Sequence, residues 1–103
     1  RKEISGNEEF QNKLTALRSK IDITDSQILE ILSKRMKIAE EIGEVKKDKN
    51  VAILQTKRWN EILGKMVLEG EEKGLSEEFV LRMFKAIHQE SINHQQKILD
   101  GIR

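Results

Sequence analysis

The sequence predicts an all-α protein of three helices per chain, one of them very long. The 103 residues contain no proline and only six glycines, and these two residue types disfavour helix interiors most strongly. Leu, Ile, Lys, Glu and Gln dominate the composition, and all five are common in helices. No segment shows the alternation of β-branched and polar residues that indicates a strand.

The first helix is predicted from about Glu9 to about Lys47, because an apolar seam repeats at steps of three and four along this segment. The seam consists of Leu14, Leu17, Ile21, Thr24, Ile28, Ile31, Arg35, Ile38, Ile42 and Val45. Such a helix would be about 55 Å long, whereas a compact domain of this size has a radius of gyration of about 13 Å. One chain cannot bury this seam, so we expect an intertwined homodimer.

The second helix is predicted from about Gln55 to about Glu69. The segment DKN at 48–50 interrupts the first pattern, and a helical apolar pattern resumes after it. The following EGEEKG sequence at 69–74 contains Gly70 and Gly74. We interpret this sequence as a turn.

The third helix is predicted to follow Ser76, whose hydroxyl suits an N-cap. Glu77 and Glu78 would then lie in the first turn, where the helix dipole favours negative charge. The helix should end near Asp100, where Gly101 can terminate it. Its inward stripe consists of Val80, Phe84, Ile87, Ser91, Gln95 and Ile98.

Composition excludes several classes of function. There are 19 Lys and Arg and 18 Asp and Glu, giving a net charge of +1, so no general attraction to nucleic acid or anionic membranes is expected. Cysteine is absent, which excludes disulfides and thiolate metal sites, and no apolar run approaches the length of a transmembrane helix. We expect a cytoplasmic protein. We also expect residues 1–9 to be a tail or linker from a longer polypeptide, and residues 10–103 to form the domain.

Arg35 occupies a seam position where Leu or Ile would be ordinary. Lys46 follows 11 residues later, so the two side chains point in directions that agree within about 20°. No Asp or Glu lies on the seam, and an unpaired buried charge is costly. The stripe of the third helix also becomes polar, at Ser91 and Gln95, while Arg58 adds a cation near the start of the second helix.

These polar residues have two interpretations. In the first, Arg35 pairs with a carboxylate of another helix, Ser91 bonds back to its own helix and Gln95 is a satisfied buried amide. In the second, the cations and neutral donors surround a cavity for a small dianion. His88 and His94 lie about 240° apart around a helix and cannot share a metal ion, so we expect no metal site.

The chain resembles the all-helical, AroQ-class chorismate mutases over about residues 13–99. The resemblance rests on the segment LTALRSKIDITDSQILEILSKRMKIAEEIGEVK, on Arg58 and on QESINHQQ in the third helix. It implies isomerisation of chorismate to prephenate in aromatic amino-acid biosynthesis, without a cofactor. The binding residues that it implies are Arg18, Arg35, Lys46, Gln55, Arg58, Ser91 and Gln95, with Lys46, Gln95 and Arg35 as the catalytic ones.

Arg18 lies 17 residues before Arg35, about 25 Å along a helix, so one small ligand cannot touch both within one chain. The resemblance implies that Arg18 instead reaches the site of the partner subunit in an antiparallel dimer. We expect these two arginines to bind the substrate carboxylates, because a planar guanidinium can contact both oxygens. Lys46 and Gln95 would donate hydrogen bonds to the ether oxygen, where negative charge develops.

Arg58 and Ser91 are assigned to the ring side of the substrate. On either side of this arginine, relatives often place acidic residues around the ring hydroxyl, but this chain has Gln55 and Trp59. Gln55 can still hydrogen-bond the hydroxyl, whereas an indole can only donate. We interpret Trp59 as a core or interface residue and expect weaker binding or slower turnover than in those relatives.

Three functions other than chorismate mutase are compatible with this sequence. An isochorismate-pyruvate lyase would use the same fold and a similar cationic pocket. A regulatory module would sense chorismate or prephenate for a fused or associated shikimate-pathway enzyme, such as the DAHP synthase to which some family members are fused. A purely structural helical dimer would bind no ligand, and its inward cations would be paired internally.

Overall fold

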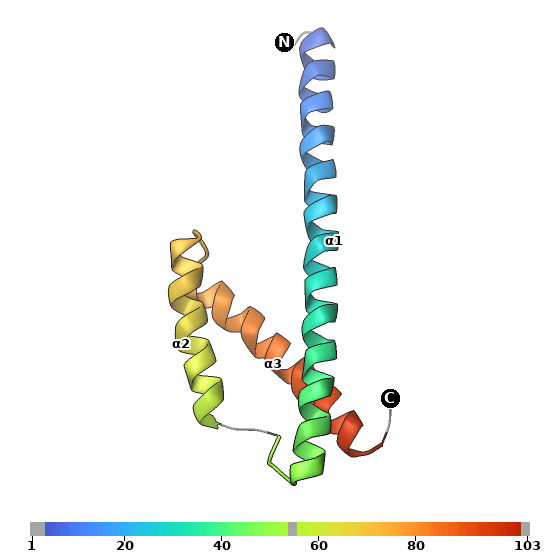
Figure 1. The fold of residues 1–103 in the computed structure, drawn as a ribbon. Helices are drawn as coiled ribbons and strands as arrows, with labels where there is room; N and C mark the ends of the chain where they lie inside the picture. The colour runs from blue at the N-terminus through green and yellow to red at the C-terminus, as the bar shows by residue number, and fades with distance from the viewer. Residues whose placement is uncertain (1–3, 54–55, 102–103) are drawn as a thin grey trace. The chain divides into compact units, whose positions relative to one another are not determined.

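The computed structural model describes residues 4–53 and 56–101, with side chains from residue 7 onward. These residues form the helices α1 (Ile4–Lys49), α2 (Thr56–Glu72) and α3 (Glu77–Leu99), labelled in Figure 1. No strand occurs in these ranges, so the predicted all-α class with one very long helix is confirmed. The chain divides into two compact units, one ending at Ser33 and one beginning at Lys34. No described helix is long and apolar enough to cross a membrane.

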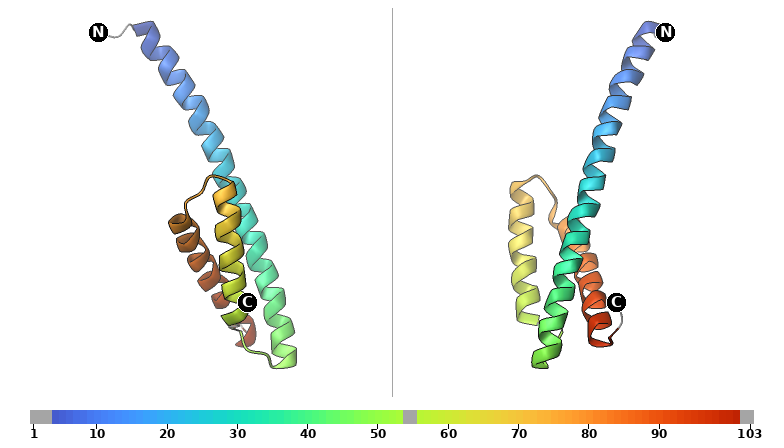
Figure 2. Two further views of the ribbon diagram at one scale, coloured as in Figure 1. Left: turned by 90° about the vertical axis from the view of Figure 1, so that its left-hand side faces the viewer. Right: turned by 45° about the vertical axis from the view of Figure 1, so that its right-hand side comes forward.

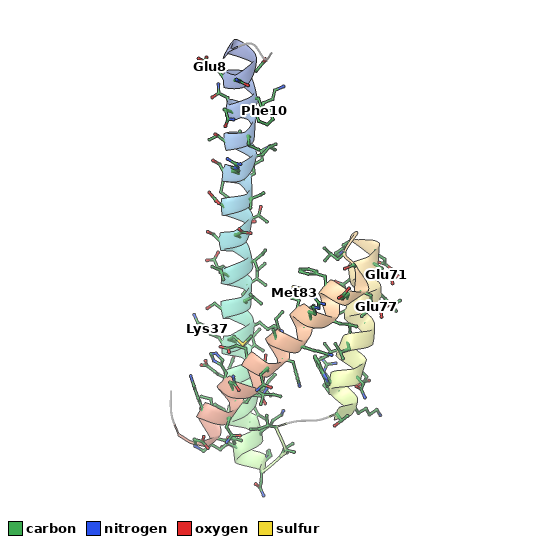
Figure 3. All side chains as sticks on the ribbon, turned by 180° about the vertical axis from the view of Figure 1, so that it is seen from behind. Glu8, Phe10, Lys37, Glu71, Glu77 and Met83 are labelled. Carbon is green, nitrogen blue, oxygen red and sulfur yellow. The ribbon has the colours of Figure 1, made fainter. Side chains whose placement is uncertain are left out.

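The first unit consists of the N-terminal part of α1. The helix begins at Ile4, earlier than the predicted start at about Glu9, because adding turns to an existing helix is far easier than starting one. Whether residues 1–9 link this chain to another domain stays a prediction. Glu8 and Phe10, labelled in Figure 3, both project from this part of α1. Leu17 and Ile21, two members of the seam, are more than half exposed.

The end of α1 is set by Asn50, as the interruption at 48–50 predicts. Asn50 has a φ of 54°, a left-handed conformation that asparagine tolerates better than most residues. The backbone N–H of Asn50 donates to the carbonyl of Lys47, and that of Val51 donates to the carbonyl of Lys46 at 2.9 Å. This pair of bonds is a Schellman motif. It reverses the chain beside Lys46.

The α2–α3 connection is shorter than predicted. α2 continues to Glu72, and Gly70 is a buried residue inside that helix, not part of the turn. A Cβ atom on Gly70 would lie 2.6 Å from Val80 Cγ2, so this glycine allows α2 and α3 to approach closely. Gly74 does lie in the turn, with a φ of 82°. Figure 3 shows Glu71 and Glu77 on either side of this connection.

The start and inward face of α3 agree with the prediction. The Ser76 hydroxyl caps the helix by accepting a hydrogen bond from the backbone N–H of Phe79. The buried residues of α3 all belong to the predicted stripe and are Val80, Ser91, Gln95 and Ile98.

The C-terminal part of α1 packs against α3, which crosses it in the views of Figures 1 and 2. Gly43 lies at the closest approach, where a Cβ atom would be 3.2 Å from the Cα atom of Gln95 and 3.3 Å from Ile98 Cβ. A side chain at position 43 would push the helices apart. The absence of one brings the α1 backbone next to Gln95.

His94 forms a polar link between these two helices. Its Nδ1 lies 2.7 Å from a carboxylate oxygen of Glu40 on α1, and its Nε2 lies 3.0 Å from one of Glu90 on α3. The hydrogen bond with Glu40, supported by Glu90, raises the pKa of His94 above its ordinary value.

We expect His94→Ala to lower the free energy of unfolding more at pH 5.5 than at pH 8.5. Because the pKa of His94 is raised in the folded state, its protonation stabilises the fold fully below the unfolded pKa of about 6.5. That contribution is lost as the pH rises through the folded-state pKa. Urea unfolding at fixed protein concentration measures the difference, and Glu40→Gln should weaken the same pH dependence. An equal loss at both pH values would contradict the assignment.

Candidate functional site

A cavity of about 400 Å³ lies within the second unit, between the C-terminal part of α1, the α1–α2 loop, α2 and α3. Its apolar wall is formed by Ile38, Ala39, Ile42, Ile53, Ile62 and Ile92. Its polar and aromatic lining consists of Arg35, Lys46, Arg58, Trp59, His88, Ser91 and Gln95. No aspartate or glutamate is among these lining residues, so the cavity has a positive charge.

Lys46 is held at the cavity by the end of α1. The reversal after Asn50 brings the carbonyl of Ile53 to 2.6 Å from Lys46 Nζ, and Gln95 Oε1 accepts a second hydrogen bond at 3.0 Å. An ammonium group has three donors, so one remains for a ligand. Burial lowers the pKa of Lys46 below its ordinary value.

Gln95 contributes from the facing helix. It is 7% exposed, and its side-chain oxygen accepts from Lys46, so its amide nitrogen is the part that can donate to a ligand. The interpretation of Gln95 as a hydrogen-bonded buried amide is therefore confirmed. The same hydrogen bond orients it as a donor at the cavity.

Arg35 and Ser91 form the second polar pair across α1 and α3. An Nη atom of Arg35 donates to the Ser91 hydroxyl oxygen, and that hydroxyl donates in turn to the carbonyl of Ile87 at 3.0 Å. Ser91 thus bonds back to its own helix, as the first interpretation predicts. Burial lowers the pKa of Arg35, but a guanidinium stays protonated in proteins.

The carboxylate partner that the first interpretation requires is missing from the described part of the chain. Within residues 7–53 and 56–101, neither Arg35 nor Lys46 has an ion-paired carboxylate. Both are instead held by neutral acceptors. Neutral acceptors orient a cation without cancelling its charge, so the positive charge of this pair is available to an anionic ligand.

Trp59 and His88 lie against each other at the cavity. Their ring centroids are 3.8 Å apart and their planes differ by 12°. His88 Nε2 is buried and makes no hydrogen bond with the described residues, although leaving such an atom unpaired costs about 1–3 kcal/mol. Burial, followed by the positive charges of Arg35 and Lys46, lowers the pKa of His88, so its imidazole is neutral at physiological pH.

Neither aromatic residue was predicted to line the site. The sequence favours a core or interface position for Trp59 and excludes only a metal site shared by His88 and His94, yet Trp59 and His88 both border the cavity. The signal for His88 is its spacing: it precedes Ser91 by three residues and Gln95 by seven, which places all three on one face of the helix.

The structure brings together five of the seven predicted site residues: Arg35, Lys46, Arg58, Ser91 and Gln95. Arg58 is an exposed residue of α2 at the cavity. Arg18 is exposed on the part of α1 in the first unit, and it is not among the lining residues. Gln55 lies outside the described residues. The substrate-binding roles of all seven stay predictions.

Comparison with known sequences decides the family. The family described as chorismate mutase type II matches residues 17–96. The chain belongs to this family. The AroQ-class resemblance of the sequence is thereby confirmed.

Several relatives of this chorismate mutase type II chain are much longer than the chain itself. It is 32% identical over 90 residues to a bifunctional chorismate mutase/prephenate dehydratase of Buchnera aphidicola, covering 87% of this chain and 23% of the relative. The bifunctional chorismate mutase/prephenate dehydratase of Escherichia coli is 29% identical over 89 residues, with 86% and 23% covered. The T-protein of Enterobacter agglomerans is 32% identical over 79 residues, with 77% and 21% covered. The chain thus spans less than a quarter of the length of these curated relatives.

The cavity of this chorismate mutase type II chain is suited to an anionic ligand. It is also suited to a ligand oxygen that gains negative charge during a reaction. Lys46 and Gln95 supply one cationic and one neutral donor that are hydrogen-bonded to each other. Such preorganised donors stabilise developing charge without reorganising during the reaction. Among the described residues, no group of three or more His, Asp or Glu is arranged to hold a metal ion.

Proposed function

We propose that this chain catalyses the rearrangement of chorismate to prephenate, the precursor of phenylalanine and tyrosine. The observation that supports the proposal most strongly is a cavity lined by Arg35, Lys46 and Arg58, to which the described residues contribute no carboxylate. Chorismate is a small dianion with two carboxylates, an ether oxygen and a ring hydroxyl. Its charge complements that of the cavity.

The reaction needs neither a base nor a nucleophile. One ether C–O bond breaks while one C–C bond forms within the same molecule, and no proton or electron is exchanged with the protein. The enzyme can therefore act by holding the enolpyruvyl group over the ring and by stabilising charge in the transition state. This requirement agrees with a cavity whose polar groups are mainly donors.

The donors at the Lys46 end of the cavity suit the ether oxygen. As the C–O bond lengthens, negative charge grows on this oxygen, and the remaining N–H of Lys46 and the amide of Gln95 can both donate to it. Their mutual hydrogen bond of 3.0 Å holds them in place before the substrate arrives. Such preorganisation favours the transition state over the ground state.

Arg35 suits a carboxylate. Only one of its guanidinium N–H groups is used in the described contact with Ser91, and a guanidinium has five. The remaining donors form a planar fork that can contact both carboxylate oxygens. Arg58 and Ser91 would bind the ring side, and Gln55 the ring hydroxyl.

We further propose that the enzyme is a homodimer in which Arg18 completes the partner's site. The exposed seam of α1 supports this proposal, because its members Leu17, Ile21, Ile28, Ile31, Ile38, Ile42 and Val45 are 43–65% exposed. An exposed row of this length, apolar except at Thr24 and Arg35, marks a protein-binding surface. The antiparallel pairing of two such helices would bring Arg18 of one chain towards Arg35 of the other.

A fused or associated DAHP synthase and a cytoplasmic location stay predictions. The bifunctional relatives combine chorismate mutase with prephenate dehydratase, which supports a larger polypeptide in general. It does not favour the synthase over the dehydratase as a neighbour of this chain.

We expect the purified protein to convert chorismate to prephenate with saturable kinetics. Loss of chorismate and formation of prephenate measure kcat and KM, with a protein-free reaction as the control for spontaneous rearrangement. Release of pyruvate and salicylate from isochorismate, without mutase activity, would instead identify a lyase. Chorismate binding without turnover would identify a sensing module, and an absence of both would leave a structural dimer.

A further inference from the structure

A groove lies on the apolar seam of α1, at the C-terminal end of that helix. It has a volume of about 400 Å³, and its lining consists of Ile38, Glu41, Ile42, Val45, Lys46, Lys49 and Val51. The four apolar lining residues are 41–62% exposed. Exposed apolar side chains that gather in a groove mark a surface for another protein segment.

The groove shares part of its lining with the cationic cavity. Ile38, Ile42 and Lys46 line both. A segment that fills the groove would therefore pack against side chains that form the wall of the candidate site.

The proposed antiparallel homodimer determines which part of the partner subunit reaches this groove. In such a pair the position numbers of facing residues have a nearly constant sum, because both helices have the same rise per residue. The partner subunit's Arg18 would reach a ligand between Arg35 and Lys46, whose midpoint is about position 40, so the sum is about 58. Position 10 of one helix then faces about position 48 of the other, within the groove residues 38–51.

Phe10 is the apolar residue that this register brings to the groove. It lies four residues before Leu14, so it extends the seam of α1 by one turn. Its side chain is 54% exposed and projects from α1 in Figure 3. The family match begins at residue 17, whereas α1 begins at Ile4, so Phe10 belongs to a part of α1 outside the matched residues.

The charges beside Phe10 complement those of the groove. Glu8 and Glu9 precede Phe10, and the last turn of α1 carries three lysines, among them Lys49 of the groove. The same register places the two glutamates opposite about positions 49–50, so opposite charges would meet. Glu41, which also lines the groove, lies about two turns before Lys49 and away from these glutamates.

We propose that Phe10 of each chain binds in the groove of its partner subunit, with Glu8 and Glu9 beside the basic last turn of the partner's α1. Each chain would thus cover the outer side of Ile38 and Ile42 in the wall of its partner's cavity. This inference rests on the homodimer of the proposed function and extends its interface to residues outside the family match.

Crosslinking between introduced cysteines tests the location of Phe10, because the chain has no cysteine of its own. In a Phe10→Cys/Lys49→Cys variant the two thiols of one chain lie about 58 Å apart along α1, so a short bismaleimide reagent can join them only between chains. We expect this variant to form covalent dimers, measured on denaturing gels, at least about fivefold faster than Phe10→Cys/Lys47→Cys, because facing thiols have a high effective concentration. Lys47 is the matched control, since it lies about 200° around the helix from Lys49.

A charge at position 10 tests the contribution of Phe10 to dimer affinity. Phe10→Asp should raise the dissociation constant of the dimer about tenfold or more, because each dimer contains two of these contacts and a charge is costly to bury in an apolar groove. Gln11→Asp introduces the same charge about 100° around the helix, and it should change the constant about twofold or less, as exposed charges do. Analytical ultracentrifugation over a range of protein concentrations measures both constants.

The outcomes separate this inference from the proposed activity, because neither comparison depends on turnover of chorismate. A wild-type protein that stays monomeric would overturn both the homodimer and the location of Phe10. A dimer with equal crosslinking of the two cysteine pairs, or with equal dissociation constants for the two aspartate variants, would overturn the location of Phe10 alone. Faster crosslinking of Phe10→Cys/Lys49→Cys together with a weaker Phe10→Asp dimer would support it.

Discussion

Replacing Lys46 by alanine is expected to lower kcat for chorismate at least a hundredfold. Among the described residues, Lys46 is the only cation that is hydrogen-bonded to Gln95, and its ammonium has one donor left after its bonds to Ile53 and Gln95. Removing one preorganised donor to a developing oxyanion typically costs about 3–4 kcal/mol of transition-state stabilisation. Because the charge on the ether oxygen grows as the C–O bond breaks, the loss should affect kcat more than KM.

Lys47→Ala is the matched control for this substitution. Lys47 lies one position along α1, outside the cavity lining, and its Nζ donates to the carbonyl of Ile98 at 3.3 Å. The Lys47→Ala variant should retain most of the wild-type kcat. Steady-state kinetics of both variants, with helix content followed by circular dichroism, make the comparison. Near-normal turnover by folded Lys46→Ala would remove Lys46 from the proposed mechanism.

The pH dependence of turnover follows from the environment of Lys46. Burial lowers the pKa of Lys46, so its ammonium loses its proton at a lower pH than an ordinary lysine, whose pKa is about 10.4. Gln95 does not titrate and sets no upper limit. Activity should therefore persist from neutral pH to about pH 8 and decline at a more alkaline pH.

The fold could be predicted from local patterns because each pattern has a local cause. The interruption at 48–50 corresponds to a left-handed Asn50, and Ser76 caps α3 through its own hydroxyl. Gly70 was wrongly assigned to the turn because its role in α2 has no local cause. Whether a glycine ends a helix or allows a neighbour to approach depends on what packs against it, and Val80 cannot be identified as that neighbour from the sequence around Gly70.

The candidate site likewise contains residues that a local pattern reveals and residues that only the packing reveals. Arg35 could be predicted because a cation on an apolar seam is anomalous by itself, and Lys46 because it follows 11 residues later and points in a similar direction. His88 could not, because a histidine on a helix is unremarkable until two properties are known: its contact with Trp59, and the burial of its Nε2 without a hydrogen-bond partner among the described residues. Those properties depend on the packing of α2 against α3.

Mixing Arg18→Ala chains with Arg35→Ala chains is expected to restore activity that neither variant has alone. If each site combines Arg35 of one chain with Arg18 of its partner, both mutant homodimers have two defective sites. In a mixed dimer both substitutions fall in one site, so the other site is intact. Random pairing of equal amounts should then give about one quarter of wild-type activity, since half of the dimers are mixed and half of their sites are intact.

The control for this experiment mixes Arg35→Ala with Lys46→Ala. Both residues line the cavity of one chain, so each site of a mixed dimer lacks one of them and no activity should return. The chains are mixed unfolded and refolded together, and activity is measured at equal total protein. If Arg18 served its own chain, its mixture with Arg35→Ala would likewise contain no intact site, and activity would stay at the sum of the two parents. Recovery in the first mixture alone therefore requires both a dimer and a site shared between its chains.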